Sequence, residues 1–305
     1  MNEAGSTQLV PTRSGFVALV GWTNVGKSSL LNRLVGTKLA AVADVSQTTR
    51  QRILGARTFP GRGQIVFVDT PGLHKPRHKM NRAMVETIRR ALSEVDLAAL
   101  VIDASRGFGA GDREATDLLR ATCERGIVAL NKIDLVSPKS RLLPMIETIS
   151  SESGYTEIVP LSALTGEGCD RLTETIISLL PPGPPLFPDD YLTDQPERVI
   201  AAEWIREKLV RETRQELPHA TAVIVERWKE REDGLLEIEA SVLVERESQK
   251  KIVIGKGGEL LKRVGSAARL ELEEFLERRI FLRLWVRVRG DWREDERMLR
   301  RLGLG

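Results

Sequence analysis

The chain has 305 residues, enough for about two domains of ordinary size. Hydrophobic residues make up 41% and charged residues 29%, a balance that is typical of globular proteins and excludes a mainly disordered chain. Two cysteines and three histidines exclude a scaffold held by several disulfides and a four-cysteine zinc site.

A polar lead-in over residues 1–14 lacks the apolar core of a signal peptide, and no uncharged apolar stretch reaches the ~18 residues of a membrane span. We therefore expect a cytoplasmic protein without a transmembrane segment. Basic charge gathers in two places: residues 246–270 hold seven basic against two acidic residues, and residues 278–301 hold nine against four. Because the whole chain carries a net charge of only +3, this concentration indicates a polyanionic partner.

Strand-like apolar runs alternate with helical patterns over residues 15–180. This alternation predicts an α/β domain with a mostly parallel sheet covered on both faces. A short turn from Pro60 to Gly63 predicts one antiparallel pair within that sheet. The expected strands are Phe16–Val20, Ile53–Phe59, Ile65–Val68, Leu97–Ile102, Ile127–Leu130 and Glu157–Leu161; the expected helices follow Lys27 and cover Asn81–Ser93, Asp112–Glu124, Lys139–Ser151 and Cys169–Leu180.

The segment from Pro181 to Pro188 holds five of the fourteen prolines, and we expect residues 181–190 to form a stiff interdomain linker. Residues 191–305 then form a second domain of α+β type. Its expected order is helix, strand, strand, short helix, Gly-rich turn, long helix, strand and final helix. The expected bounds are Pro196–Glu216, Thr221–Lys229, Leu235–Val244, Glu259–Glu277 and Phe281–Val288, with the last helix after Asp291.

A phosphate-binding loop, GWTNVGKS, occupies residues 21–28, directly after the strand FVALV and at the start of a helix. Glycines let backbone N–H groups curl around phosphate oxygens, Lys27 can reach the β- and γ-phosphates, and the Ser28 hydroxyl can ligate Mg²⁺. The predicted phosphate-binding residues are Gly21, Asn24, Val25, Gly26, Lys27, Ser28, Ser29 and Gly72.

Three further motifs follow at strand ends. In VDTPG, Asp69 can hold Mg²⁺ through a water molecule and Gly72 can offer its amide to the γ-phosphate. The segment NKID provides Asn131, Lys132 and Asp134, and the Asp134 carboxylate can accept from guanine N1–H and from the exocyclic amine. The segment SAL provides Ser162, Ala163 and Leu164, where the Ala163 amide can reach guanine O6. Carboxyl ends of parallel strands share one sheet edge, so one nucleotide could touch all of these motifs.

These motifs, in this order, resemble those of the translation-factor-like GTPases over residues 15–180. The resemblance implies a Ras-like P-loop GTPase domain with a six-stranded sheet, two switch loops, and GTP and GDP with Mg²⁺ as ligands. It also implies that Thr49 of the TTR triplet binds Mg²⁺ together with Ser28 and Asp69, with Thr48 as the rival. A surface loop without a ligand role is the alternative for both threonines.

Leu73 follows Gly72, where Ras has a glutamine that orients water, so we expect slow intrinsic hydrolysis. GTPases of this kind resemble those that use K⁺, held partly by a phosphate-loop asparagine, and Asn24 occupies that position. The alternative is that Asn24 only shapes the loop. His74 and His78 lie in the second switch and are weaker candidates for a general base.

The second domain carries a GxxG element at residues 255–258, between two helical segments and within a basic region. Bare glycines let a backbone approach a sugar-phosphate chain, and the element order looks like a type II KH domain, which clamps about four single-stranded nucleotides. A helix–helix turn with a solvated charged face is the alternative. The predicted RNA-binding residues are Ile254, Gly255, Lys256, Gly257, Gly258, Lys262 and Arg263.

Two tryptophans and a row of alternating arginines lie outside the GxxG element. Trp228 and Trp285 lie on strands, where we expect them to be core residues and not stacking platforms. The alternating Arg283, Arg287 and Arg289 face either solvent or phosphate.

A GTPase domain followed by a type II KH domain at this spacing resembles the Era family over nearly the whole chain. The resemblance implies binding near the 3′ end of small-subunit ribosomal RNA, a role in 30S subunit assembly and peripheral association with the inner face of the cytoplasmic membrane. We also expect a monomer. The function expected is a slowly hydrolysing GTP switch that binds single-stranded ribosomal RNA. The alternative is a constitutive RNA-binding scaffold whose nucleotide site is mainly structural.

Overall fold

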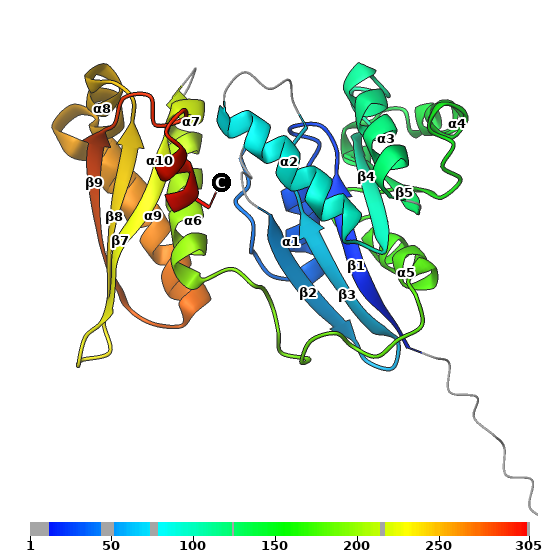
Figure 1. Cartoon of the computed structure of the whole chain (residues 1–305), viewed down its shortest axis with the longest axis horizontal. Coiled ribbons are helices and arrows are strands. Elements are labelled where there is room, and N and C mark those ends of the chain that lie inside the picture. Colours follow the sequence, from blue (N-terminus) through cyan, green and yellow to red (C-terminus); the bar gives the residue numbers. More distant parts are fainter. Residues whose placement is uncertain (1–11, 44–51, 74–78, 124, 214–216, 304–305) are drawn as a thin grey trace, which may run out of the picture.

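A computed structural model describes residues 12–43, 52–73, 79–123, 125–213 and 217–303, apart from the side chains of residues 79, 81–84 and 218–219. Two α/β units lie side by side in Figure 1, the first holding residues up to α5 and the second beginning at α6. Among the described residues, no helix has both the length and the apolar composition needed to cross a bilayer.

The first unit is built on a six-stranded sheet with the order β2-β3-β1-β4-β5-β6. Only β2 runs antiparallel to its neighbour, which confirms the predicted single antiparallel pair. The strands β3 and β4 are buried at every position, as expected for strands covered on both faces. The strands are β1 (Arg13–Val20), β2 (Ile53–Phe59), β3 (Gly63–Asp69), β4 (Leu97–Asp103), β5 (Gly126–Asn131) and β6 (Ile158–Pro160).

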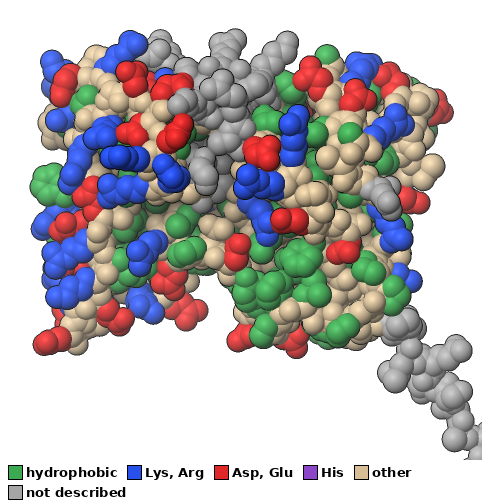
Figure 2. Space-filling view, in the orientation of Figure 1, with side chains coloured by type: hydrophobic (Ala, Val, Ile, Leu, Met, Phe, Trp, Pro, Cys, Tyr) green, Lys and Arg blue, Asp and Glu red, His purple; other side chains and the backbone are tan. Residues whose placement is uncertain are grey.

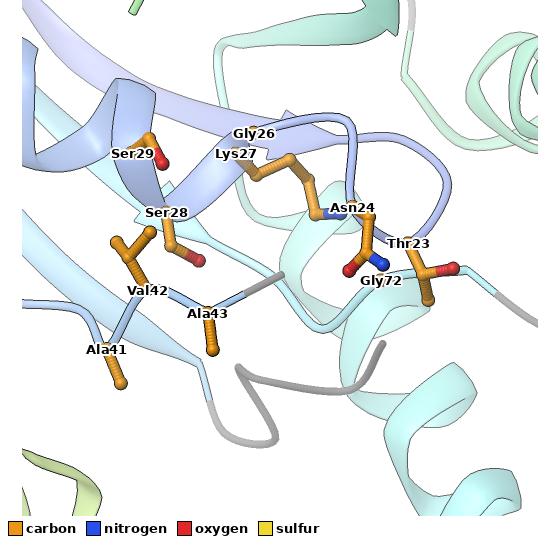
Figure 3. A pocket seen from close by; sticks show the side chains of 10 residues that line it. All are labelled: Thr23, Asn24, Gly26, Lys27, Ser28, Ser29, Ala41, Val42, Ala43 and Gly72. Carbon is orange, nitrogen blue, oxygen red and sulfur yellow. The ribbon is translucent and has the colours of Figure 1, made fainter. Parts of the chain in front are cut away.

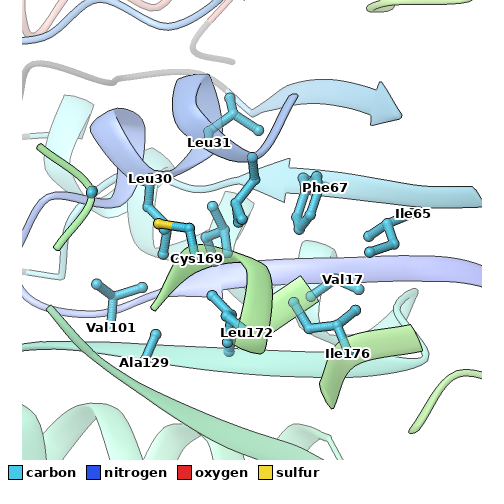
Figure 4. Close-up of a cluster of buried hydrophobic side chains, with 14 of the residues drawn as sticks. Val17, Leu30, Leu31, Ile65, Phe67, Val101, Ala129, Cys169, Leu172 and Ile176 are labelled. Atoms are coloured by element: carbon cyan, nitrogen blue, oxygen red, sulfur yellow. The ribbon is translucent and has the colours of Figure 1, made fainter. Parts of the chain in front are cut away.

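Helices cover both faces of this sheet, in agreement with the predicted layers. One face carries α1 and α5, whose leucines and isoleucines pack on strand residues such as Val17 and Phe67 (Figure 4). The other face carries α2, α3 and α4. These helices are α1 (Lys27–Val35), α2 (Lys79–Ser93), α3 (Ala110–Thr122), α4 (Leu142–Ser153) and α5 (Cys169–Leu179), with 3₁₀ turns η1 (Ile133–Leu135) and η2 (Lys139–Arg141) before α4.

The second unit has a three-stranded sheet with the order β7-β8-β9, in which β7 and β8 are antiparallel and β8 and β9 are parallel. Helices α6, α8 and α9 cover one face through a shared apolar core. Its elements are α6 (Glu197–Glu212), α7 (Leu217–Ala220), β7 (Ala222–Glu230), β8 (Leu236–Val244), α8 (Glu247–Ile254), η3 (Lys256–Gly258), α9 (Glu259–Leu276), β9 (Ile280–Val288) and α10 (Glu296–Arg301).

Helix ends differ from the prediction at several places, most of all in α6 and α10. Helix α6 ends at Glu212 instead of Glu216, because Thr213 adopts an extended backbone and its hydroxyl donates to Leu209 O. The last helix begins at Glu296, where Asp295 caps it by accepting from the amides of Arg297 and Met298. The residues before this cap insert Trp292 into a buried cluster on the sheet.

The Pro-rich segment is attached to Gln64 of β3, and the residues that follow it are attached to the edge strand β2. Ala56 N donates to Leu192 O at 2.9 Å, and the Thr193 hydroxyl donates to Leu54 O at 2.6 Å. Phe187 stacks on Tyr191 with ring centroids 4.2 Å apart. The predicted spacer is therefore held on the first unit by hydrogen bonds as far as Thr193, in addition to any stiffness that its prolines give.

Candidate nucleotide site and RNA groove

The phosphate loop joins β1 to α1, and two of its positions require glycine. Gly26 caps α1 with φ 97°, and a Cβ there would lie 2.4 Å from Asn131 Nδ2. A Cβ on Gly21, where φ is 155°, would lie 2.4 Å from Val101 O. Both glycines are thus needed because neighbouring strands approach the loop closely.

A pocket opens above this loop (Figure 3). It is lined by Thr23, Asn24, Gly26, Lys27, Ser28, Ser29, Ala41, Val42, Ala43 and Gly72. Six of the eight predicted phosphate-binding residues are therefore together in one pocket. Of the other two, Gly21 lies at the start of the loop and the side chain of Val25 lies in the core.

Lys27 is only 6% exposed, and its ammonium group donates to Gly21 O at 3.0 Å and Trp22 O at 2.9 Å. Burial lowers the pKa of Lys27 to about 8, although the charge of Asp69 acts to raise it. A buried ammonium group beside helix-terminal amides is suited to an anionic ligand, whose charge would raise this pKa.

Ser28 and Asp69 meet at the mouth of the loop, where Ser28 Oγ donates to Asp69 Oδ2 at 2.8 Å. Asp69 is fully buried at the carboxyl end of β3. A hydroxyl and a carboxylate are the oxygen donors that Mg²⁺ prefers, so the residues present fit this ion. The threonines of the first switch, Thr48 and Thr49, lie outside the described residues, as do His74 and His78.

The predicted base-binding residues lie at the adjoining strand ends. Asp134 Oδ1 is buried and has no hydrogen-bond partner among the described residues. Such an acceptor is costly unless a ligand satisfies it, which fits the N1–H and amine of guanine.

The side chains of Asn131 and Lys132 form hydrogen bonds with neighbouring loops. Asn131 Nδ2 donates to Val25 O at 2.8 Å, while its Oδ1 accepts from Ala163 N at 2.9 Å. Lys132 Nζ donates to Asn24 O at 2.6 Å. We expected the Ala163 amide to reach guanine O6, but in the structure it donates to Asn131 Oδ1. Asn131 thereby joins the phosphate loop to the loop after β6.

Two residues that sequence reasoning missed support these loops. Arg33 of α1 donates to Ala163 O at 3.1 Å and to Leu164 O at 2.6 Å. Asp103 pairs with Lys132 Nζ at 2.7 Å, and although burial opposes it, Lys132 and Ser105 hold the pKa of Asp103 below its ordinary value. Asp103 lies at the end of β4, on the same sheet edge as the other motifs, and this position could have identified it from the sequence.

The second unit presents a groove between α9 and β9, next to the GxxG turn. Gly255, Gly257 and Gly258 all have positive φ, of 75°, 62° and 84°. Of the predicted RNA-binding side chains, Lys262 lines the groove, whereas Arg263 pairs with Glu212 at 2.7 Å. The lining is Gly258, Leu261, Lys262, Gly265, Ser266, Arg269, Leu282, Arg283 and Leu284.

Helix α6 of the second unit contacts the pocket of the first. Val42 N donates to Glu207 Oε2 at 2.9 Å, and Arg211 NH2 donates to Val42 O at 2.8 Å. Glu207 has a fully buried side chain that also pairs with Lys38 at 2.8 Å. Because Val42 lines the phosphate pocket, one residue connects the nucleotide site to the second unit.

These features define a P-loop GTPase domain joined to a KH domain. The family model described as a 50S ribosome-binding GTPase matches residues 16–132, and the KH domain model matches residues 216–293. GTPase Era of Geobacter metallireducens is 51% identical, over 96% of this chain and 98% of the relative. GTPase Era of Caldanaerobacter subterraneus is 46% identical, over 95% and 97%. The chain belongs to the Era family of GTPases.

Solved structures agree with this assignment. An Aquifex aeolicus Era variant bound to GDP·AlF₄⁻ matches with a TM-score of 0.94 and 41% identity, over 96% of this chain and 100% of that one. An Era complex with MgGDPNP and nucleotides 1506–1542 of 16S ribosomal RNA matches equally well, over 96% and 99%. The predicted fold class, a P-loop GTPase domain followed by a KH domain, is confirmed.

Proposed function

We propose that this protein is a switch that binds Mg²⁺ with GTP or GDP, hydrolyses GTP slowly, and binds single-stranded RNA near the 3′ end of small-subunit ribosomal RNA during 30S assembly. Residues 15–180 would bind the nucleotide and residues 191–305 the RNA, with residues 181–190 between them. The observation that carries the proposal is Val42, which lines the phosphate pocket and is held at both backbone polar atoms by α6.

The nucleotide would use the groups already described. Lys27 would pair with the β- and γ-phosphates, the Gly72 amide would donate to the γ-phosphate, and Asp134 would accept from guanine. Ser28 and Asp69 would hold Mg²⁺, with Thr49 as the third expected ligand; when bound, Mg²⁺ neutralises charge on the β- and γ-phosphate oxygens.

We further propose that Asn24 helps to bind K⁺ beside the transferring phosphate. Leu73 is buried and apolar, so it cannot orient water as a glutamine does. Asn24 lines the pocket with φ 64°, close to the end of Lys27 in Figure 3. Turnover should be clearly faster in K⁺ than in Na⁺ buffer for the wild type, and Asn24→Ala should abolish that difference. Equal turnover in the two salts would contradict this role.

The RNA arm of the proposal is tested by crosslinking the wild type and Gly257→Asp to total cellular RNA, each with a GTP analogue and with GDP. A Cβ at Gly257 meets no atom within 4 Å, but its φ of 62° strains any side chain, so the variant combines this backbone strain with repulsion between the carboxylate and phosphate. Enrichment of one ribosomal RNA site that needs both the glycine and the triphosphate would support the switch. Equal recovery with GDP and the analogue would favour the constitutive scaffold instead.

The same proposal gives the protein a cytoplasmic location and a monomeric state, with peripheral association at the inner face of the membrane. Co-sedimentation with anionic vesicles, compared in the GTP and GDP states, would test the membrane association.

A further inference from the structure

The sheet of the KH domain has a second face, turned away from α6, α8 and α9. On β9, Leu282, Leu284 and Val286 pack into the core with those helices. Side chains alternate along a strand, so the residues between them point to the opposite face. We call this the outer sheet face: Phe281, Arg283, Trp285 and Arg287 on β9, Glu237 and Glu239 on β8, Glu226, Arg227 and Lys229 on β7, and Arg231 next to β7.

Two aromatic rings on the outer sheet face are open to solvent. Trp285 is 49% exposed and Phe281 is 38% exposed. The expectation that Trp285 is a core residue is therefore wrong, because the strand alternation turns it away from the helices. Trp285 pairs with Ser241 of β8, and the small serine side chain leaves the indole ring open to solvent on that side.

Two guanidinium groups lie over the Phe281 ring. Arg231 and Arg283 lie 5.5 and 5.3 Å from the centroid of the Phe281 ring, in cation–π range. Basic side chains gather over this sheet in the view of Figure 2.

Acidic residues lie beneath these arginines instead of beside them. Arg231 pairs with Glu237 at 3.2 Å, but its side chain is 43% exposed against 10% for the carboxylate. The pair of Arg283 and Glu239 repeats this arrangement, with side chains 48% and 22% exposed. The pair of Arg287 and Glu226 does so as well, with side chains 58% and 27% exposed. The carboxylates thus hold the arginines in place, and a partner would meet aromatic rings and guanidinium groups.

We propose that the outer sheet face binds RNA that continues from the GxxG groove, with a base stacked on Trp285 and phosphates held by Arg283 and Arg287. The groove and the face are continuous, because Arg283 belongs to both. Exposed rings alternating with cations along a strand match the chemistry of single-stranded nucleic acid, which presents a base and a phosphate in every repeat. The inference rests on the proposed RNA binding and extends its footprint.

The test compares two fluorescein-labelled single strands from the 3′ end of small-subunit ribosomal RNA. One has about five nucleotides, enough for the GxxG groove, and the other about twelve. Trp285→Ala should weaken binding of the longer strand by roughly 5- to 100-fold and leave the shorter strand unchanged. Trp285→Phe should recover most of the loss, since it keeps a stacking ring. Arg287→Gln should reduce the salt dependence of longer-strand binding by about 0.7 in the log–log slope.

Leu270→Ala is the matched control, because it truncates an exposed apolar side chain on α9 that lines neither the groove nor the outer sheet face. Thermal melts of each variant check that the fold is retained. If Trp285→Ala binds both strands like the wild type while Gly257→Asp binds neither, the outer sheet face is overturned and the RNA function stands. If the wild type binds neither strand, the RNA function fails and the inference falls with it. Weakened binding of Trp285→Ala to 30S particles, with unchanged binding to both naked strands, would assign the face to a protein and also overturn the inference.

Discussion

Lys27 is a buried cation whose protonation depends on what occupies the phosphate pocket. Its pKa of about 8 should rise when a triphosphate lies beside it, because an opposite charge favours the protonated form. Binding then takes up a proton above pH 8, and GTP affinity should fall as the pH rises through 8, by at most tenfold per unit.

Calorimetry at about pH 8.5, in buffers of different ionisation enthalpy, should detect an uptake approaching one proton. Lys27→Arg is the control, because its guanidinium stays charged and should abolish the uptake even if affinity drops. Affinity that is independent of pH from 7.5 to 9.5 would contradict this assignment.

Asp134 is expected to select guanine through its buried carboxylate. Asp134→Asn should lower GTP affinity by roughly 10- to 100-fold, since the charge-assisted hydrogen bonds to N1–H and the amine are lost. The new amide can donate to the oxygen that xanthine carries in place of that amine, so XTP binding should improve. Equilibrium competition between the two nucleotides measures both effects. Asp170→Asn, an exposed change on α5, should alter neither, and an unchanged GTP preference in Asp134→Asn would remove Asp134 from the base site.

Single residues were predictable where a motif fixes their chemistry. Lys27, Ser28 and Asp69 follow from the spacing of the phosphate loop and from the end of an apolar strand. Arg33 could not be predicted, because its role comes from the carbonyl groups of a loop that is distant in sequence. Trp285 was misjudged because propensity does not say which sheet face a helix covers.

At the scale of elements, the Pro-rich segment depends on Gln64, a fully buried residue of β3. Its carboxamide accepts from the amides of Leu186 and Phe187, both at 2.9 Å, and donates to Thr58 Oγ1 and Phe187 O. Gln64→Leu would leave two amides without their acceptor, which costs about 1–3 kcal/mol for each group that stays buried. Hydrogen exchange at Leu186 and Phe187 should accelerate strongly. Leu186→Ala, which keeps its backbone amide, should not accelerate exchange; if Gln64→Leu also leaves exchange unchanged, the proposed attachment is wrong.

Strands and helices of the first unit were predictable because buried parallel strands give continuous apolar runs. The ends of elements were less predictable than the elements themselves. Asp295 caps α10 by local hydrogen bonds, yet the sequence placed the helix start after Asp291, since both positions carry an aspartate that can cap. The attachment of the linker to the first unit was invisible, because it rests on Gln64 of β3 and on hydrogen bonds to β2, and not on the prolines.

At the scale of the whole molecule, the contact of α6 with Val42 joins two binding sites. Motion of Val42 with the bound nucleotide would be transmitted to Glu207 and Arg211, and thereby to the orientation of the KH domain. Coupling between binding sites is reciprocal, and typical values are 5- to 150-fold. We expect RNA to change nucleotide affinity by the same factor by which the nucleotide changes RNA affinity.

Arg211→Ala removes the donor to Val42 O together with the ion pair between Arg211 and Glu207 at 2.9 Å, and it leaves the phosphate loop and the GxxG turn untouched. RNA affinity measured with a GTP analogue and with GDP should converge toward a ratio of one, while the affinity for each nucleotide without RNA stays near that of the wild type. Arg278→Ala removes a comparable exposed arginine, paired with Glu230 at the far end of the sheet, and should keep the wild-type ratio. A ratio unchanged in Arg211→Ala would mean that the nucleotide reaches the KH domain through another contact, whereas its loss in Arg211→Ala alone would make Val42 the point where the two domains communicate.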